Sequence, residues 1–384
     1  MQRAIGQYPS VVALQRKLEA SQDEVEPAGA LPDPMLGAMV QSVGKPWDPM
    51  APMSMGQIEF TQPLYYPGKR AARRRAAAAE TRVRAAEVSD LQWAIATEIR
   101  STYARVYALD RERESVVAAN DLVKTLGDAV AGRYAAGRAE QEAVVKLDLE
   151  RFRLDERLGD IQAERASLVA TLNQLAERDQ SEPFGIVRQL PDGLRVPPNV
   201  AELALARSPS VAVRRAEIQA ARDRLEAARL ETRPNLLVGL AAGSTVDALP
   251  VFTARFGVEL PVWKADKQEP MVRSSRRRLD AAHAELAATE AEVRSGAARL
   301  LARWERDNAQ IARYEQAILP QTSAALNAAT AAYAAGQGDF SNLIEDFQLW
   351  LDARVALARR RAERFMTWAE IQNLIAGSLS RRSR

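Results

Sequence analysis

Cysteine is absent from this 384-residue chain, which excludes disulfides, thiolate metal ligands and cysteine nucleophiles. Histidine occurs once, at His283. One histidine supports neither a Ser/His/Asp set nor a conventional protein metal site, so we expect His283 at the surface. Aromatic residues are scarce at 6%, and the net charge of +3 gives no strong field for nucleic acid. These absences exclude the commonest catalytic and metal-binding classes, and we expect no catalytic residues, no metal site and no cofactor.

Long apolar runs are also missing. No stretch of 18 apolar residues occurs, so no transmembrane helix is predicted. Residues 1–7 lack the apolar core of a signal peptide. A later segment, Val200–Arg207, leads into a repeat of the N-terminal region, and only half of that lead-in is present at the start. We therefore expect that the sequence begins inside a repeat unit, with a secretion signal lost or lying upstream.

What the chain does have is an internal repeat. Segments about 200 residues apart echo one another in the same order: Tyr8–Val11 and Ser208–Val211, Glu98–Ser101 and Glu292–Ser295, Tyr134–Gly137 and Tyr333–Gly336, Leu172–Leu175 and Ile371–Leu374. A repeat of this length indicates a duplicated structural unit and not a solenoid turn. Any function is therefore built from two similar halves.

Each repeat is predicted to contain a helix, two strands, a very long helix, a turn and a return helix. Ala, Glu, Arg and Leu dominate the composition, which favours long, closely packed helices. We expect a kink at Pro320 in the second long helix. The predicted boundaries are as follows: a first unit over 1–178 with a β-hairpin at 35–64 and a helical hairpin at 69–177; a linker over 179–197; a second unit over 198–377 with a β-hairpin at 236–261 and a helical hairpin at 270–376; and a basic tail over 378–384.

The predicted strands alternate between apolar and polar residues. Ile58 and Phe60 flank Glu59, and Phe252 and Phe256 alternate with polar neighbours that include Arg255. One interpretation is an antiparallel sheet with one face on a core and one in water. The other is a membrane barrel, in which Glu59, Arg255 and Glu259 face the lumen.

Four strands are too few to close a barrel, which needs about 8. The hairpins must therefore pair with other copies of the chain or be covered by helices. Three copies would supply about 12 strands and leave no open edge.

The order of these features resembles the TolC-like outer membrane efflux family over nearly the whole chain. The matching segments are the two Tyr-x-x-Gly turns, the stretch Asn342–Asp346, and Gln62–Lys69, which is similar to the entry to the long helix in the heavy-metal resistance-nodulation-division branch. The resemblance implies a mainly α fold with a small β part. In it, tandem-repeat protomers build a trimeric α-helical barrel and a 12-stranded transmembrane β-barrel, with four strands from each chain.

The family resemblance also implies a function. The chain would be a passive exit duct and not an enzyme, placed in the outer membrane and spanning into the periplasm. Its partners would be two further copies, a periplasmic adaptor protein, an inner membrane pump and outer membrane lipid, with no nucleic acid. The cargo would be metal cations or drugs. Two alternatives stay open: the duct of a type I protein secretion system, and a soluble structural coiled-coil protein whose hairpins act as caps.

The resemblance places the two turns, with Tyr134, Gly137, Tyr333 and Gly336, at a periplasmic tip that is closed at rest. It further implies an acidic ring after the second turn, where this chain has Asn342, Glu345 and Asp346. A ring of carboxylates would concentrate cations at a pore entrance. The alternative is that these acids only interact with the dipole of their helix. The matching first-repeat positions, Ala143 and Lys146, carry no acid.

Basic residues flank the first turn and follow the first hairpin. Arg133 and Arg138 are expected to pair with acids near the second turn and hold the tip closed; solvated cations at a helix end are the alternative. Asp339 is expected to be an N-cap. The run Lys69–Arg75 lacks the interleaved aromatics of a nucleic-acid site, so we expect a positive collar just inside the membrane.

Overall fold

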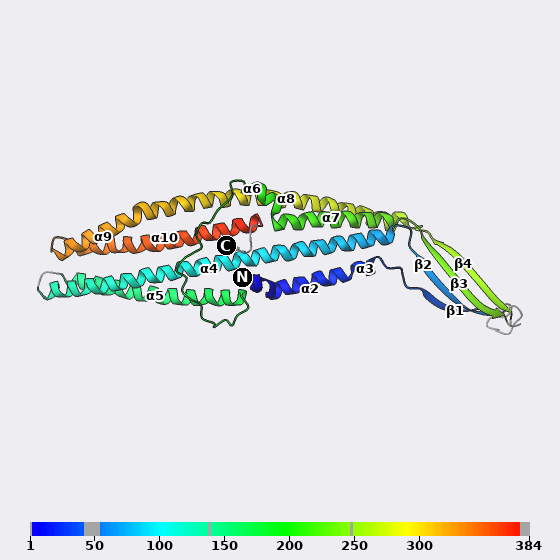
Figure 1. Cartoon of the computed structure of the whole chain (residues 1–384), viewed down its shortest axis with the longest axis horizontal. Helices are drawn as coiled ribbons and strands as arrows, with labels where there is room; N and C mark the ends of the chain where they lie inside the picture. Colours follow the sequence, from blue (N-terminus) through cyan, green and yellow to red (C-terminus); the bar gives the residue numbers. More distant parts are fainter. Residues whose placement is uncertain (1, 42–53, 137–139, 246–248, 377–384) are drawn as a thin grey trace. The chain divides into compact units, whose positions relative to one another are not determined.

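The structure of the protein is a computed structural model that describes residues 2–41, 54–136, 140–245 and 249–376 (Figure 1). Its strands are β1 (Met35–Gln41), β2 (Met55–Leu64), β3 (Asn235–Thr245) and β4 (Pro250–Glu259). Its helices are α1 (Gln2–Gln7), α2 (Pro9–Asp23), α3 (Val25–Ala28), α4 (Lys69–Ala135), α5 (Gln141–Leu175), α6 (Val200–Arg207), α7 (Pro209–Leu230), α8 (Glu269–Arg313), α9 (Leu319–Ala334) and α10 (Phe340–Leu374), with π-helical turns at Lys264–Gln268 and Tyr314–Ile318. None of the helices in these ranges is both long and apolar enough to cross a bilayer.

The chain divides into two compact units, and each draws on both halves of the sequence. A helical unit comprises Met1–Val12, Ser89–Pro209 and Glu290–Arg384. A sheet unit comprises Ala13–Val88 and Ser210–Thr289. The compact units thus cut across the two repeats, and the repeat boundaries stay a prediction.

The sheet unit contains one four-stranded antiparallel sheet in the order β1-β2-β3-β4. Its two hairpins pair with each other through β2 and β3, in a register that sets Leu64 opposite Leu236 and Ile58 opposite Ala242. The strands β1 and β4 stand at the two edges. A single chain therefore joins its own hairpins but leaves two strand edges without a partner among the described strands.

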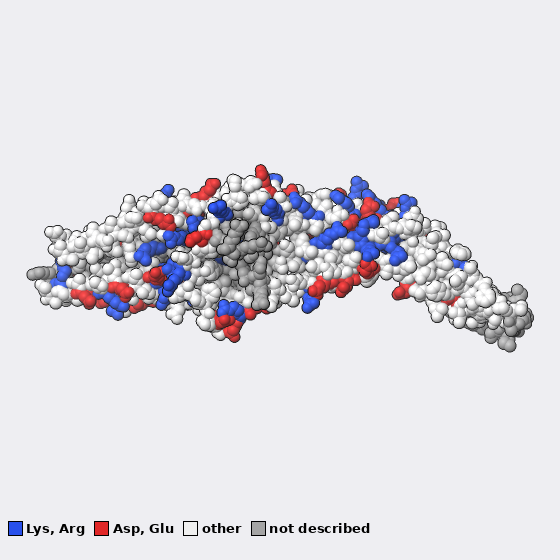
Figure 2. All heavy atoms as spheres, viewed as in Figure 1, with Lys and Arg blue, Asp and Glu red and all other residues white. Residues whose placement is uncertain are grey.

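The register sorts the side chains into two contrasting faces. One face is almost wholly apolar, and its large side chains are exposed: Leu36, Val40, Ile58, Phe60, Leu236, Leu240, Phe252, Phe256 and Val258. The other face carries polar groups such as Glu59, Thr61 and Arg255. The alternation expected from the sequence is confirmed, because successive residues of a strand point to opposite faces. Figure 2 shows few charged side chains over the strands on the face in view, whereas Lys, Arg, Asp and Glu crowd the helices.

The core of the helical unit is a long apolar seam shared by α4, α5, α9 and α10. On α4 it follows helical spacing through Val116, Ala119, Val123, Leu126 and Val130. Facing it are Leu147 and Leu154 of α5 and Leu343, Phe347 and Leu351 of α10.

The second long helix is interrupted where the first is continuous. A π-helical turn at Tyr314–Ile318 separates α8 from α9, and Pro320 follows directly. The irregularity that the structure shows is this π-helical turn, just before Pro320, since proline is tolerated at the start of α9 but leaves the preceding turn short of a hydrogen bond. The helix predicted before each β-hairpin is split in two, into α2 and α3 in the first repeat and into α6 and α7 in the second, the latter before Pro209.

The linker at 179–197 is anchored to the helical unit by a buried ion pair. Arg165 on α5 donates from Nε to Oδ1 of Asp110 at 2.6 Å, and it also donates to the carbonyls of Phe184 and Gly185. The second carboxylate oxygen of Asp110 accepts from the Val187 amide at 2.8 Å. Asp110 is almost fully buried, so this contact fixes the extended segment against α4 and α5.

Candidate functional site

The turn between α9 and α10 is a Schellman motif. Gly336 adopts a φ of +79°, its amide donates to the carbonyl of Tyr333, and the Gln337 amide donates to the carbonyl of Ala332. A residue with a side chain adopts this conformation only with strain, which accounts for the glycine. Asp339 then begins α10 as its N-cap, accepting from the Ser341 amide, as expected from the sequence.

The first helical hairpin contacts this turn through Arg133. Its guanidinium lies over the Tyr333 ring, 4.6 Å from the ring centre, and donates to the Tyr333 carbonyl. Tyr333 is buried and meets the Phe340 ring edge-on at 5.7 Å. Tyr134, its counterpart in the first repeat, is 48% exposed. Arg133 therefore reaches the second turn and contacts a carbonyl and a ring there, while the pairing with acids stays a prediction. Gly137 and Arg138 lie outside the described residues.

The acidic positions lie beyond the first turn of α10. Asn342 and Glu345 are exposed on one side of the helix, while Asp346 is half-buried. The first turn of α10 contains no acid. Because the influence of a helix dipole fades within that turn, the dipole explanation for Glu345 and Asp346 loses weight.

Further polar contacts join the two helical hairpins along their length. Lys146 on α5 donates to the Ser341 hydroxyl at 3.2 Å, and its hydrogen bond with Glu142 raises the pKa of the Lys146 ammonium. Deeper in the seam, Gln348 donates to the buried Glu150 at 3.2 Å. The first and second helical hairpins are thus joined by polar contacts from the tip inward. Moving the hairpins apart would break these contacts.

The strongest of these ties centres on Glu112 of α4. Its buried carboxylate accepts from Arg157 on α5 at 2.9 Å and from Arg359 on α10 at 2.9 Å. One carboxylate therefore bridges three helices. The buried Glu112 carboxylate would be left with an uncompensated charge if either arginine moved away. This site therefore favours the packed arrangement of the two helical hairpins.

The predicted lumen residues lie together on the polar face of the sheet. Arg255 of β4 reaches across β3 to Glu59 of β2, with 2.6 Å between the guanidinium and the carboxylate. It passes over Gly239, where a side chain would come within 3.4 Å of the Arg255 Cβ. Glu259 shares this face at the end of β4 and accepts from Asn235. Whether this face lines a lumen stays a prediction.

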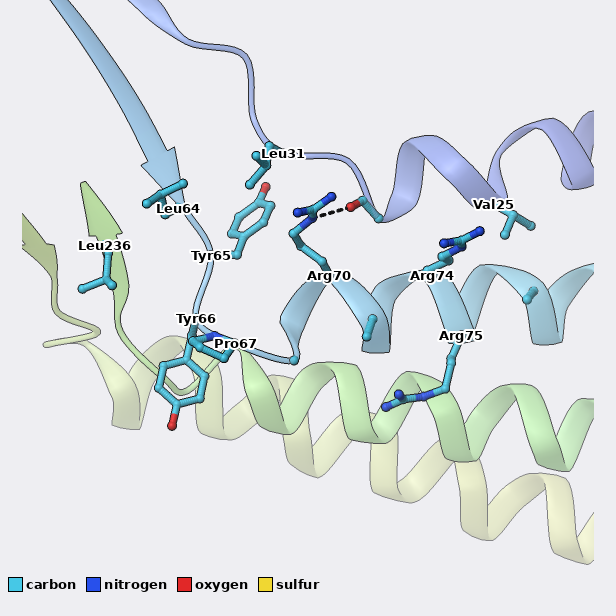
Figure 3. Close-up of a pocket in the computed structure, with 14 residues that line it drawn as sticks. Val25, Leu31, Leu64, Tyr65, Tyr66, Pro67, Arg70, Arg74, Arg75 and Leu236 are labelled. Atoms are coloured by element: carbon cyan, nitrogen blue, oxygen red, sulfur yellow. Dashed lines mark hydrogen bonds between the residues drawn. The ribbon is translucent and has the colours of Figure 1, made fainter. Parts of the chain in front are cut away.

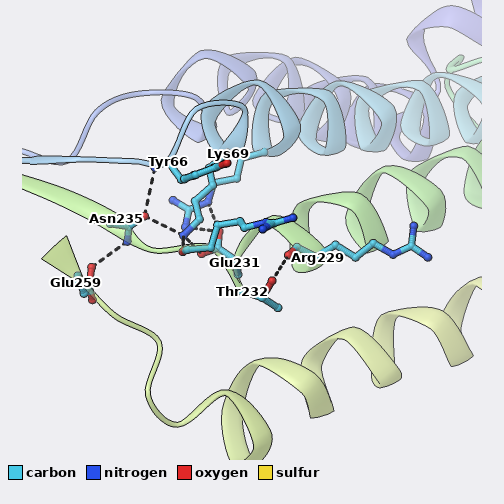
Figure 4. A network of polar contacts seen from close by, with 9 residues as sticks. Tyr66, Lys69, Arg229, Glu231, Thr232, Asn235 and Glu259 are labelled. Carbon is cyan, nitrogen blue, oxygen red and sulfur yellow. Dashed lines mark hydrogen bonds and ion pairs between the residues drawn. The ribbon is translucent and has the colours of Figure 1, made fainter.

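A polar network at the junction of strands and helices could not be read from the sequence (Figure 4). Lys69, with 1% of its surface exposed, donates to the Arg233 carbonyl and to Asn235 Oδ1, both at 2.8 Å, and lies 3.5 Å from Glu231. Arg73 also pairs with Glu231, and its guanidinium lies over the Tyr65 ring. The positive collar expected over Lys69–Arg75 is therefore wrong for Lys69, which is buried because it satisfies the backbone of the entering strand.

His283 is exposed, as predicted. Within the ranges that the structure describes, no three His, Asp or Glu side chains gather closely enough to hold a metal ion. The tip residues belong to the helical unit, and Glu59, Arg255 and Glu259 belong to the sheet unit, so two separate sites result.

Comparisons with known proteins agree with this architecture. Residues 200–377 match the family described as outer membrane efflux protein. The cobalt-zinc-cadmium resistance protein CzcC of Cupriavidus metallidurans is 24% identical over 356 residues, which is 92% of this chain and 83% of that protein. The outer membrane protein VceC from Vibrio cholerae has a similar fold, with a TM-score of 0.83 at 20% identity over 99% of this chain and 95% of VceC. CusC also has a TM-score of 0.83, at 13% identity over 98% of this chain and 91% of CusC.

The four-stranded sheet and the two helical hairpins together give this chain the same fold as VceC. Residues 200–377 match the outer membrane efflux protein family, and the whole chain has the fold of VceC and CusC, which supports the resemblance predicted from the sequence.

Proposed function

We propose that three copies of this chain form the outer membrane exit duct of a tripartite efflux system that exports metal cations. The observation that carries this proposal is the sheet, which has one exposed apolar face, one polar face and two open edges. Pairing β4 of one copy with β1 of the next removes both edges, and three copies give a closed barrel of about 12 strands. Its apolar face would then meet lipid.

The helical unit supports the same assembly. Phe152 on α5 is 70% exposed, whereas its counterpart in the second repeat, Leu351 on α10, is only 3% exposed. Val145 and Leu149 extend the exposed apolar stripe at helical spacing. Within one chain the second hairpin is covered by the first. In a ring of copies the first hairpin of each chain would be covered by the second hairpin of its neighbour.

A relative supports the proposed cargo, and the passive character of a duct supports the proposed partners. The relative from Cupriavidus metallidurans is a cobalt-zinc-cadmium resistance protein, which supports metal cations as cargo. A passive duct supplies no energy, so an inner membrane pump and a periplasmic adaptor would complete the system, with the adaptor contacting the helical tips. Purified protein is expected to conduct ions in a planar bilayer; a well-folded trimer without conductance would refute the duct.

The acid at Glu345 is proposed to act in threefold repetition at the entrance, where three carboxylates would attract and retain multivalent cations. Replacement Glu345→Gln is expected to weaken block of the channel by divalent or trivalent cations by about tenfold, without changing folding. Single-channel recordings with and without the blocking ion measure this effect. Asp128→Asn removes another exposed acid on α4 and serves as the control. Equal block in Glu345→Gln and wild type would leave Glu345 without a role at the entrance.

The contact between Arg133 and Tyr333 is proposed to hold the tip closed. A cation–π contact and a charge-assisted hydrogen bond together stabilise the closed state by about 2 kcal/mol. Arg133→Ala should therefore raise the ratio of open to closed channels by about 30-fold, since 1.4 kcal/mol is tenfold. The open fraction in bilayer recordings measures this ratio. Lys124→Ala, which removes an exposed cation on the same helix, should leave it unchanged.

A further inference from the structure

A groove of about 1010 Å³ opens in the sheet unit where β2 passes into α4 (Figure 3). We call it the junction groove and define it by six lining residues: Leu31, Leu64, Tyr65, Arg70, Arg74 and Leu236. Four of these six are apolar or aromatic, and two are arginines. The groove therefore combines an apolar wall with a basic wall.

The apolar wall continues the apolar face of the sheet. Leu64 and Leu236 are paired in register, and they project to the same side as Phe60 and Leu240. Phe60 and Leu240 are exposed, as is Leu31. Any hydrocarbon that covers this face of the sheet can therefore extend without a polar interruption into the junction groove.

The basic wall comes from the first two turns of α4. Arg70 is held in place by a hydrogen bond from Nε to the Gly29 carbonyl at 2.7 Å, and Figure 3 shows it beside Tyr65. Arg74 pairs with Glu26, which is exposed. Arg75 also lines the cavity and has no ion-pair partner within the described part of the chain. Three arginines against one carboxylate leave two positive charges beside an apolar surface.

We infer that the junction groove binds a phospholipid with an anionic headgroup. The lipid phosphate would lie between Arg70 and Arg74, which can each donate two hydrogen bonds to phosphate oxygens. Its acyl chains would pass over Leu31, Leu64 and Leu236 towards the apolar face of the sheet. This inference rests on the proposed function, because a bilayer around the sheet supplies the lipid. A free phosphate ion would leave most of this apolar cavity uncovered.

Native mass spectrometry of the purified protein in detergent tests the inference directly. Wild-type protein mixed with equal amounts of phosphatidylglycerol and phosphatidylcholine should retain phosphatidylglycerol in preference. The double variant Arg70→Ala/Arg74→Ala should lose this preference by about tenfold, because two charge-assisted contacts are removed. Arg82→Ala, an exposed arginine further along the same helix, should behave as wild type. Leu31→Gln should weaken retention of both lipids, because it places a polar amide in the apolar wall.

The outcomes separate the inference from the proposed function. Protein that conducts in a bilayer but retains both lipids equally overturns the lipid site and leaves the duct intact. Protein that fails to conduct but prefers phosphatidylglycerol overturns the duct alone. Release of the lipid by millimolar inorganic phosphate would show a simple anion site and also overturn the inference. If the double variant does not fold, the headgroup preference of the wild type and its loss in Arg74→Ala decide the question.

Discussion

Replacement of Lys69 by methionine is expected to lower the stability of the sheet unit by about 3 kcal/mol, although the change keeps the length and apolar stem of the side chain. The ammonium group is almost fully buried and has two acceptors, the Arg233 carbonyl and Asn235, and Glu231 is its ion-pair partner. Without it, the Arg233 carbonyl loses this donor, and the Asn235 amide oxygen keeps only the Tyr66 amide. A partly buried acceptor that loses a donor costs part of its desolvation free energy.

The size of this effect depends on how much of the network is buried. Glu231 retains Arg73 as a partner and is 26% exposed, so its share of the loss is small. Most of the lost stability comes from Asn235, which also accepts from the Tyr66 amide and donates to Glu259. Lys69 therefore holds together the end of β2, the start of β3 and the end of β4.

Thermal unfolding followed by circular dichroism, or by the mobility of the heated trimer on a gel, measures the change. Arg82→Met on the same helix is the matched control, because Arg82 is exposed and makes no ion pair within the described residues. It should shift the midpoint very little. If Lys69→Met and Arg82→Met unfolded at the same midpoint temperature, the Lys69 network would contribute nothing to the stability of the fold.

The second large effect is expected for Gly243→Ala in β3, which should prevent assembly of the sheet. A Cβ atom at position 243 would lie 2.6 Å from the Gln57 Cα and closer still to the Gly56 carbonyl, and both belong to the backbone of β2. No rotamer change can relieve a clash with backbone. We expect a loss of more than about 3 kcal/mol, at the upper end of overpacking effects.

The seam between β2 and β3 is the only pairing between the two hairpins in the described sheet, so its loss would separate the repeats at this end. Gly243→Ala should yield little of the proposed trimer as a heat-resistant species in outer membrane preparations. Gly37→Ala is the control, since a methyl group there meets nothing within 4 Å. Normal trimer yield for Gly243→Ala would show that β2 and β3 can move apart without cost.

Periodicity made most of the elements predictable. The alternation of Phe252 and Phe256 with Arg255 predicted the two faces of the sheet, because strand geometry allows no other distribution. The glycine of the second Tyr-x-x-Gly turn predicted a helix end, and Gly336 indeed adopts a positive φ there. The exact path of the second long helix was less predictable, since a proline sets a local constraint but not where the π-helical turn relieves it.

Contacts between distant segments were not predictable in the same way. In the sequence Lys69 begins a basic run, whereas its partners Arg233 and Asn235 lie more than 160 residues away. Arg133 was expected near the second turn, but its placement on the Tyr333 ring depends on how the two helical hairpins pack. A run of basic residues specifies charge, and only packing decides which member is buried.

The sequence by itself determined the duplicated plan, the order of helices and strands, the two-faced hairpins and the absence of cysteine chemistry. These features depend on local spacing, which is written directly in the chain. Tertiary structure decided that the two hairpins share one sheet, that Glu112 bridges three helices, and that an apolar face runs into a groove with arginines. Each of these depends on residues brought together from opposite repeats, where the free energy of burial and not the local pattern selects the partner.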